Sequence, residues 1–182
     1  KTARLTNTLM PKTYEAIFVP GKHGVLLRSL DKEGAITTFA GTFQATTSPV
    51  RSEASNGASA STTLQALSGY YLAKNILSIA VDQKSGALFY LTRDPISRGV
   101  IGTTVQWDGS TKLAVNGSKQ KQGFSSPIAS WRPQWSSGQV ALALSAADDV
   151  PGYAYTLGKT GDLAPLLGPV AGLTFLPHPS ES

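Results

Sequence analysis

The stretch ILSIAVDQKSGALFYL, residues 76–91, contains two apolar runs, residues 76–81 and 87–91, separated by a short polar segment that ends at Gly86. Runs of five or six residues suit buried strands and are too short for ordinary helices. A polar, glycine-ended segment between two such runs is typical of a tight turn. The stretch therefore predicts a β-hairpin.

The residues that follow extend this hairpin to four strands. A loop over residues 92–99 leads into a third apolar run at 100–106, and a turn at 107–110 leads into a fourth run at 112–115. Because the connections are short, we expect consecutive strands to pair in antiparallel order. The sequence predicts a four-stranded meander.

The same pattern occurs in two other parts of the chain. A later copy is expected to start near Ile128 and to form a hairpin through residues 135–140, with strands at 140–144, 152–157 and 163–167. An earlier copy is expected at residues 14–19, 25–30, 36–41 and about 63–71. Residues 42–62 are rich in Ser, Thr, Ala and Gly, which predicts a mobile insertion in the third turn of that copy.

A unit of four antiparallel strands repeated about every 40 to 50 residues is typical of β-propeller blades. We therefore expect one all-β domain over residues 1–182, a partial propeller with three four-stranded blades plus the start of a fourth near Gly172, and an outer strand at residues 4–6. Propellers close with about four to eight blades, so further blades are expected outside this chain. A β-sandwich is the alternative fold.

Several segments carry a family resemblance: RLTNT at residues 4–8 with PKTYEA at 11–16, LDKEG at 30–34, NILSIAVD at 75–82 with LFYL at 88–91, and SSP at 125–127 through Trp131 and Trp135 to VPGY at 150–153. They resemble an uncharacterised family of TolB-like, WD40-type propellers predicted in many candidate-phyla bacteria. The likeness spans the chain except residues 42–62. It implies a propeller behind a membrane anchor in the cell envelope, with no catalytic residues to carry over.

The composition narrows the possible chemistry. The chain has no Cys and two His, His23 and His178, which excludes disulfides and Cys nucleophiles and argues against a multi-His metal site or a His-driven triad. No stretch approaches the roughly 20 apolar residues that cross a bilayer, and the first residues lack the apolar core of a signal peptide. We expect any anchor or export signal to lie outside this chain, and no membrane contact by the chain itself.

The net charge of +5 comes from scattered basic residues, the densest group being Lys119 and Lys121. Proteins that bind nucleic acids usually concentrate basic residues on one face and interleave them with aromatic side chains. The sequence therefore predicts a mildly basic surface and no nucleic-acid partner.

Candidate binding residues follow from the predicted blades. The loop between strands two and three, and the connection to the next blade, emerge on one face, where propellers commonly bind ligands; this is an analogy between folds. The candidates assigned to this face or to strands beside it are Arg93, Asp94, Arg98, Arg132, Asp148, Asp149 and Trp131. Arginine forks suit anionic ligands, although Arg93 and Asp94 are as well suited to pair with each other.

Two further readings stay open at these positions. Asp148-Asp149 is a candidate for Ca²⁺, but Ca²⁺ takes about six to eight oxygen ligands, so a solvated turn is favoured and no cofactor is expected. Trp131 and Trp135 either stack on a ligand or pack between blades, and packing is the commoner role in a repeat protein.

These observations predict a non-catalytic binding module of a bacterial envelope protein, whose loops hold a protein, peptide or glycan. The alternative is a propeller hydrolase or lyase that uses Asp94, Asp148 or Asp149, with or without a divalent cation. Exposed blade edges also predict self-association into a homo-oligomer.

Overall fold

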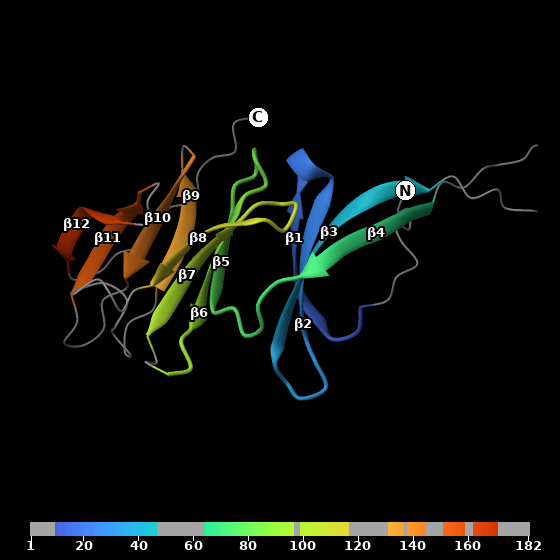
Figure 1. The fold of residues 1–182 in the computed structure, drawn as a ribbon, viewed down its shortest axis with the longest axis horizontal. Helices are drawn as coiled ribbons and strands as arrows, with labels where there is room; N and C mark the ends of the chain where they lie inside the picture. Colours follow the sequence, from blue (N-terminus) through green and yellow to red (C-terminus); the bar gives the residue numbers. More distant parts are fainter. Residues whose placement is uncertain are drawn as a thin grey trace, which may run out of the picture. The chain divides into compact units, whose positions relative to one another are not determined.

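The computed structural model describes residues 10–46, 64–96, 99–116, 131–136, 138–144, 151–158 and 162–170 (Figure 1). The chain divides into two compact units, Lys1–Leu72 and Ala73–Ser182. The described regular structure is all-β apart from one 3₁₀ turn, and it forms three open four-stranded antiparallel sheets.

Unit 1 holds a single meander of four strands. In sheet order these are β1 (Thr13–Val19), β2 (Gly24–Leu30), β3 (Ile36–Thr46) and β4 (Leu64–Tyr71). The β1–β2 connection is the 3₁₀ turn Pro20–Lys22, and it ends at His23, whose left-handed backbone (φ 46°) lets its N–H donate to the Pro20 carbonyl. This hairpin occupies the position that its polar, glycine-containing segment predicts.

Unit 2 holds two meanders that follow one another in the sequence. The first contains β5 (Ser78–Val81), β6 (Leu88–Arg93), β7 (Val100–Val105) and β8 (Thr111–Asn116). The second contains β9 (Trp131–Ser136), β10 (Gln139–Leu144), β11 (Gly152–Leu157) and β12 (Leu163–Val170). In both, each strand pairs with the next one in sequence.

The expected all-β class and the three meanders are confirmed, with corrected bounds. Strand β3 continues to Thr46, so the insertion expected from residue 42 begins no earlier than residue 47. Strand β5 begins at Ser78, not at Ile76, and β12 runs on to Val170. The strand predicted at residues 4–6, the blade start near Gly172 and the rest of the insertion lie outside the described residues.

The core of unit 2 lies between its two sheets. Phe89 and Leu91 on β6 and Val100 at the start of β7 form one buried cluster with four residues of the second sheet: Trp131, Val140, Leu142 and Leu157. Strand alternation explains this set, because residues two apart along a strand point to the same face. Leu88 and Tyr90, on the other face of β6, are also buried.

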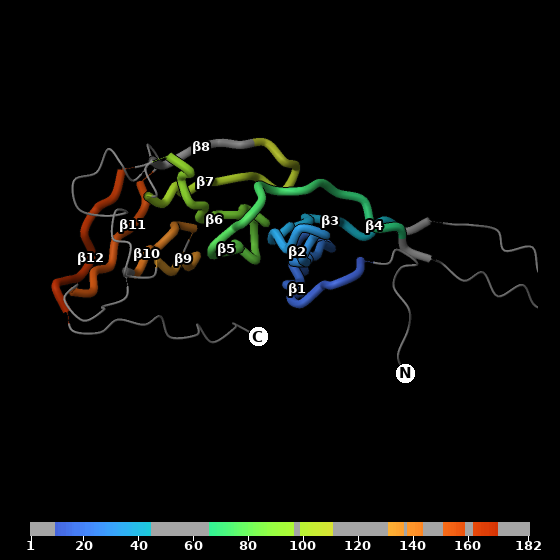
Figure 2. The backbone as a smooth tube through the Cα atoms, turned by 90° about the horizontal axis from the view of Figure 1, so that it is seen from below, coloured from blue at the N-terminus to red at the C-terminus, as the bar shows by residue number. Residues whose placement is uncertain are grey.

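The first strands of the two sheets meet in unit 2. Strand β5 lies beside β9 (Figure 2), and the indole Nε1 of Trp135 donates a hydrogen bond of 3.1 Å to the backbone carbonyl of Ala80. Trp131 and Trp135 point to the same face of β9, so both contribute to the packing between the sheets. The packing role weighed for these tryptophans is confirmed.

Candidate functional site

The β6–β7 loop carries two of the predicted site residues, Arg93 and Asp94. Arg93 ends β6 opposite Val100 and is exposed. The Asp94 N–H donates to the Gly99 carbonyl at 2.8 Å, and Asp94 Oδ1 accepts the N–H of Ile96 at 2.9 Å. The Asp94 carboxylate therefore holds the shape of its own loop.

This use of aspartate recurs in four described turns. Asp31, Asp82, Asp94 and Asp108 each accept, through Oδ1, the backbone N–H of the residue two positions later, at 2.9 to 3.0 Å. Such turns replace a backbone hydrogen bond by one to a side chain, which is why Asp is favoured in them. In these four turns the carboxylates fix the backbone of the loop in which they lie.

Three segments of unit 2 come to the same end of its sheets. The N–H of Leu77, just before β5, donates to the Leu91 carbonyl near the end of β6 at 2.8 Å. Trp135 near the end of β9 bonds to Ala80 in the second half of β5, so the start of β9 lies at the same end as the start of β5 and the β6–β7 loop. This end is the lower one in Figure 1. Leu77, Arg93, Ile96 and Arg132 are exposed at this end, but Arg93 is on the face of β6 that carries Phe89 and Leu91, whereas Arg132 is on the face of β9 that points away from the core cluster.

The remaining predicted residues divide into three groups. Arg132 is exposed on the face of β9 opposite to Trp131. Trp131, also predicted as a ligand contact, is only 6% exposed in the core cluster, which favours its packing role over stacking on a ligand. Arg98, Asp148 and Asp149 lie outside the described residues.

The structure adds two residues that the sequence reasoning missed. Ile96, at the tip of the β6–β7 loop, is 93% exposed, and Leu77 at the same end is also exposed. The signal was present in the sequence as Pro95-Ile96, an apolar residue in an otherwise polar loop. Strand periodicity does not detect such a residue, because it scores runs and ignores single positions in loops.

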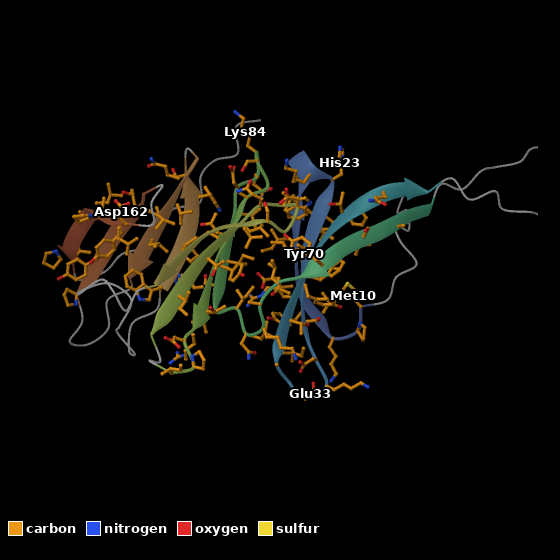
Figure 3. The ribbon with its side chains drawn as sticks, viewed as in Figure 1. Met10, His23, Glu33, Tyr70, Lys84 and Asp162 are labelled. Atoms are coloured by element: carbon orange, nitrogen blue, oxygen red, sulfur yellow. The ribbon has the colours of Figure 1, made fainter. Side chains whose placement is uncertain are left out.

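The opposite end of the first sheet in unit 2 has a different chemistry. Its β5–β6 turn carries Asp82 and the exposed Lys84, which is labelled in Figure 3, and its β7–β8 turn carries Asp108. Burial of the Asp82 carboxyl acts to raise its pKa, but hydrogen bonds from the Ser85 hydroxyl and the N–H groups of Lys84 and Ser85, with the Lys84 charge, outweigh it. The net pKa of Asp82 lies below its ordinary value of 3.8.

Unit 1 contains an ion pair that links two of its strands. Arg28 on β2 forms an ion pair with Glu15 on β1, with 2.8 Å between Nη1 and Oε2, and its guanidinium lies 5.7 Å from the centre of the Tyr14 ring. The two strands place these residues together, because Glu15 and Arg28 are register partners. The cluster ties the edge strand β1 to β2.

In the described part of the chain, no three His, Asp or Glu side chains gather into a group that could hold a metal ion. Within the same ranges no helix is long and apolar enough to cross a membrane. No protein-family model, curated protein or solved structure matches the chain.

Proposed function

We propose that the chain is part of a β-propeller of the cell envelope and that it acts as a non-catalytic binding module. Its ligand, a protein, peptide or glycan, is held at the end of the sheets where the β6–β7 loop emerges. One observation carries the proposal: β5 and β9 lie side by side, and Trp135 near the end of β9 bonds to Ala80 in the second half of β5, which aligns the two strands. Loop ends of successive sheets therefore meet at one end, as in propellers that bind ligands with their loops.

The strand order of the two meanders in unit 2 supports the propeller part of the proposal. Each meander of unit 2 keeps its strands in sequence order, and the first strand of one sheet lies next to the first strand of the following sheet. Blades of a propeller have this arrangement around a central channel. In a β-sandwich, connections of the Greek-key type usually link the two sheets instead.

The described carboxylates of the first sheet in unit 2 shape its loops, which supports a module that presents loops to a ligand. Asp94 engages the Ile96 N–H through Oδ1, and Asp94, Asp82 and Asp108 follow the same turn geometry. A turn former that occurs in three connections of one sheet fits a scaffold for presenting loops.

The arrangement of unit 2 is testable with spin labels, because the chain has no native Cys. Cysteines introduced at the exposed positions Arg93 and Arg132 report the end where the loops meet, and a second pair at Lys84 and Arg132 reports opposite ends. We expect the first pair to give the shorter electron–electron distance. Equal distances, or a shorter distance for the second pair, would contradict the proposed stacking of blades.

The binding function is tested with the full chain on peptide and glycan arrays, alongside a panel of hydrolase and lyase substrates. We expect saturable binding to a ligand class and no turnover. Reproducible turnover that Asp94→Asn abolishes, with the fold retained, would replace the proposal with the catalytic alternative. Asn is the matched change here, because its carbonyl also accepts the Ile96 N–H.

Self-association belongs to the same proposal. Strand β12 is an edge of its sheet, its side chains are all apolar, and its six central residues are exposed. An exposed apolar edge strand favours contact with another chain. Light scattering is expected to show a mass that rises with concentration, and Leu166→Lys is expected to lower it. A monodisperse monomer at high concentration would contradict self-association.

A further inference from the structure

We propose that one face of the unit 1 sheet binds the same face of a second copy of the chain. We call it the aromatic face and define it by six residues that strand register places on it: Ala16, Phe18, Leu27, Phe39, Gly69 and Tyr71. The inference rests on the self-association proposed above and adds a surface other than β12 to it. It does not depend on the ligand-binding end of unit 2.

Two rows of register partners cross the four strands on this face. One row consists of Phe18, Val25, Gly41 and Gly69, and the other consists of Ala16, Leu27, Phe39 and Tyr71. Register partners lie directly opposite each other, and residues two apart along a strand share a face, so both rows belong to one surface. Side-chain contacts agree with the register. The Phe39 and Tyr71 rings lie 5.2 Å apart, and a Cβ at Gly41 would lie 2.5 Å from Phe39 and 2.7 Å from Leu67.

Each row has a large exposed ring at one edge of the sheet and a small exposed residue at the other edge. Phe18 on β1 is 58% exposed, and its row ends at the exposed Gly69 on β4. Tyr71 on β4 is 63% exposed, and its row begins at the exposed Ala16 on β1. A Cβ at Gly69 would clash with the backbone oxygen of Ala40, so this edge of the row stays without a side chain.

This distribution of large and small residues makes the aromatic face complementary to itself. Sheets that pack face to face lie about 10 Å apart with interdigitating side chains, so a protruding ring needs a small residue opposite it. A two-fold axis along the strands, between β2 and β3, lays β1 of one copy over β4 of the other. Phe18 of each copy then lies over Gly69 of the other, and Tyr71 lies over Ala16. Contacts across a two-fold axis are reciprocal, so both fits form twice, which favours a second copy as the occupant.

None of the four strands of unit 1 places a charged side chain on the aromatic face. The two charged residues of these strands, Glu15 and Arg28, pair with each other on the opposite face. Charged residues of the connecting turns, such as Lys22 and Glu33, lie at the ends of the sheet. Two copies therefore meet without like charges opposite one another, although the whole chain carries a net charge of +5. Depletion of charge and enrichment in Tyr and Phe are typical of the core of a protein interface.

The exposed area predicts a weak dimer. Phe18 and Tyr71 are exposed to 58% and 63%, and an aromatic side chain has about 200 Å² of surface, so the two rings leave roughly 240 Å² per copy in water. A stable interface buries about 800 Å² on each partner. The two rings supply about a third of this area, so we expect dimers that form only as the concentration rises.

The test measures the mass of the full chain against concentration by analytical ultracentrifugation. The chain carries Leu166→Lys throughout, which removes the contribution of β12. We expect dimers to persist in this background at high concentration. Ala16→Glu and Tyr71→Lys are each expected to raise the dimer dissociation constant at least about tenfold, because each puts a charge into the contact between the copies.

The double variant Ala16→Glu/Tyr71→Lys tests the arrangement of the two copies. The two-fold axis places the introduced charges of opposite sign face to face across the copies, so we expect the double variant to recover most of the lost affinity. Within one copy the two positions lie at opposite edges of the sheet, three strand spacings or about 14 Å apart. Pairing inside a copy therefore does not account for the recovery.

Leu30→Lys is the matched control for Tyr71→Lys. Leu30 is 42% exposed and lies on the opposite face of the same sheet, two residues from Arg28 along β2. This variant is expected to leave the dimer dissociation constant nearly unchanged, and circular dichroism checks that every variant keeps its strands. If Leu30→Lys weakened the dimer as much as Tyr71→Lys does, added positive charge in general would be responsible, and the assigned face would be wrong.

Other outcomes also overturn the inference, and they separate it from the proposed self-association. A monomer in the Leu166→Lys background, with association of the parent chain, would reject the aromatic face and keep β12 as the contact. A parent chain that stays monomeric would reject self-association itself. A double variant that recovers no affinity would reject the two-fold arrangement. A monomer that binds phosphatidylcholine vesicles, with binding lost in Tyr71→Lys, would replace the second copy by a lipid surface.

Discussion

The first sheet of unit 2 and the sheet of unit 1 both have a glycine on the third strand beneath an aromatic ring, but the two rings differ in burial. In each, the third strand carries a glycine opposite an apolar residue of the second strand: Gly102 faces Leu91, and Gly41 faces Val25. An aromatic ring lies over each glycine. It belongs to Phe89 in unit 2 and to Phe39 in unit 1.

Phe89 and Phe39 differ in their burial and in the side chains that pack against them. Phe89 is fully buried and packs with Trp131 of the neighbouring sheet. In unit 1 Phe39 is partly exposed and packs against Tyr71, with 5.2 Å between ring centres, while Tyr71 and Phe18 are 63% and 58% exposed. The difference teaches that a buried apolar residue and a buried glycine do not by themselves bury the ring beside them: Val25 and Gly41 are buried in unit 1, yet Phe39 stays partly exposed. In unit 2 the neighbouring sheet packs over the ring and buries it completely.

The largest expected loss of stability comes from replacing the buried ring, Phe89, and it is compared with the loss from replacing Phe39. Phe89→Ala removes a fully buried ring and leaves a cavity between the sheets, which is expected to cost about 3–5 kcal/mol of unfolding free energy. Phe39→Ala is expected to cost clearly less. All three Trp lie in unit 2, so their fluorescence in a urea titration follows Phe89→Ala, and hydrogen exchange of unit 1 peptides follows Phe39→Ala. Equal losses would contradict the comparison.

The glycines give the next effect. A Cβ at residue 102 would lie 2.5 Å from Cζ of Phe89, and the buried ring has no room to move aside, so Gly102→Ala is expected to cost about 1–3 kcal/mol. At Gly41 the nearest atoms, Phe39 Cε1 at 2.5 Å and Leu67 Cδ1 at 2.7 Å, belong to partly exposed side chains that can rotate. Gly41→Ala is therefore expected to be milder in the same assays. A larger loss of stability in Gly41→Ala than in Gly102→Ala would contradict the comparison.

The contact between β9 and β5 is expected to give a smaller effect. Trp135→Phe keeps an aromatic ring but removes the donor to the Ala80 carbonyl, which is expected to cost about 0.5–1.5 kcal/mol in thermal or urea unfolding of unit 2. Trp135→Leu removes the ring as well and is expected to cost more. If both variants matched the parent chain, this contact would not hold the sheets together.

The smallest effect is the pH dependence of the β5–β6 turn. Because the folded pKa of Asp82 lies below its ordinary value of 3.8, the folded state binds this proton less readily than the unfolded state. The resulting stabilisation is present above the ordinary value and is lost as the pH falls through the folded pKa. Solvent screening at this turn keeps the effect to about a few tenths of a kcal/mol. Asp82→Asn is expected to remove it, so melting temperatures of parent and variant differ less at low pH than at pH 7.

Most strands were predictable from the sequence, because strand and turn signals are local. Residues 152–157 form β11 as predicted, and the Asp82 and Asp108 turns occur where polar, glycine-containing segments predict them. Errors occurred where local signals conflict with pairing. Ile76 is apolar and fully buried but precedes β5, and β3 continues through Thr46 because it pairs with β4 as far as Leu64.

The candidate site was predictable only in part. The charged β6–β7 loop was identified from its residues, and Arg93 and Asp94 lie there. The role of Asp94 in holding its own loop, the burial of Trp131 and the exposure of Ile96 depend on packing and backbone geometry. None of these is encoded in the identity of a single residue.

The sequence by itself determined which segments form strands and where the chain turns, since alternation and turn residues act over a few neighbours. Only the tertiary structure decided which face of each sheet is covered and which loop ends meet. The physical reason is that both faces of a strand such as β6 carry apolar side chains. Their pattern does not specify a partner, and the packing of Trp131 and Trp135 between the sheets of unit 2 does.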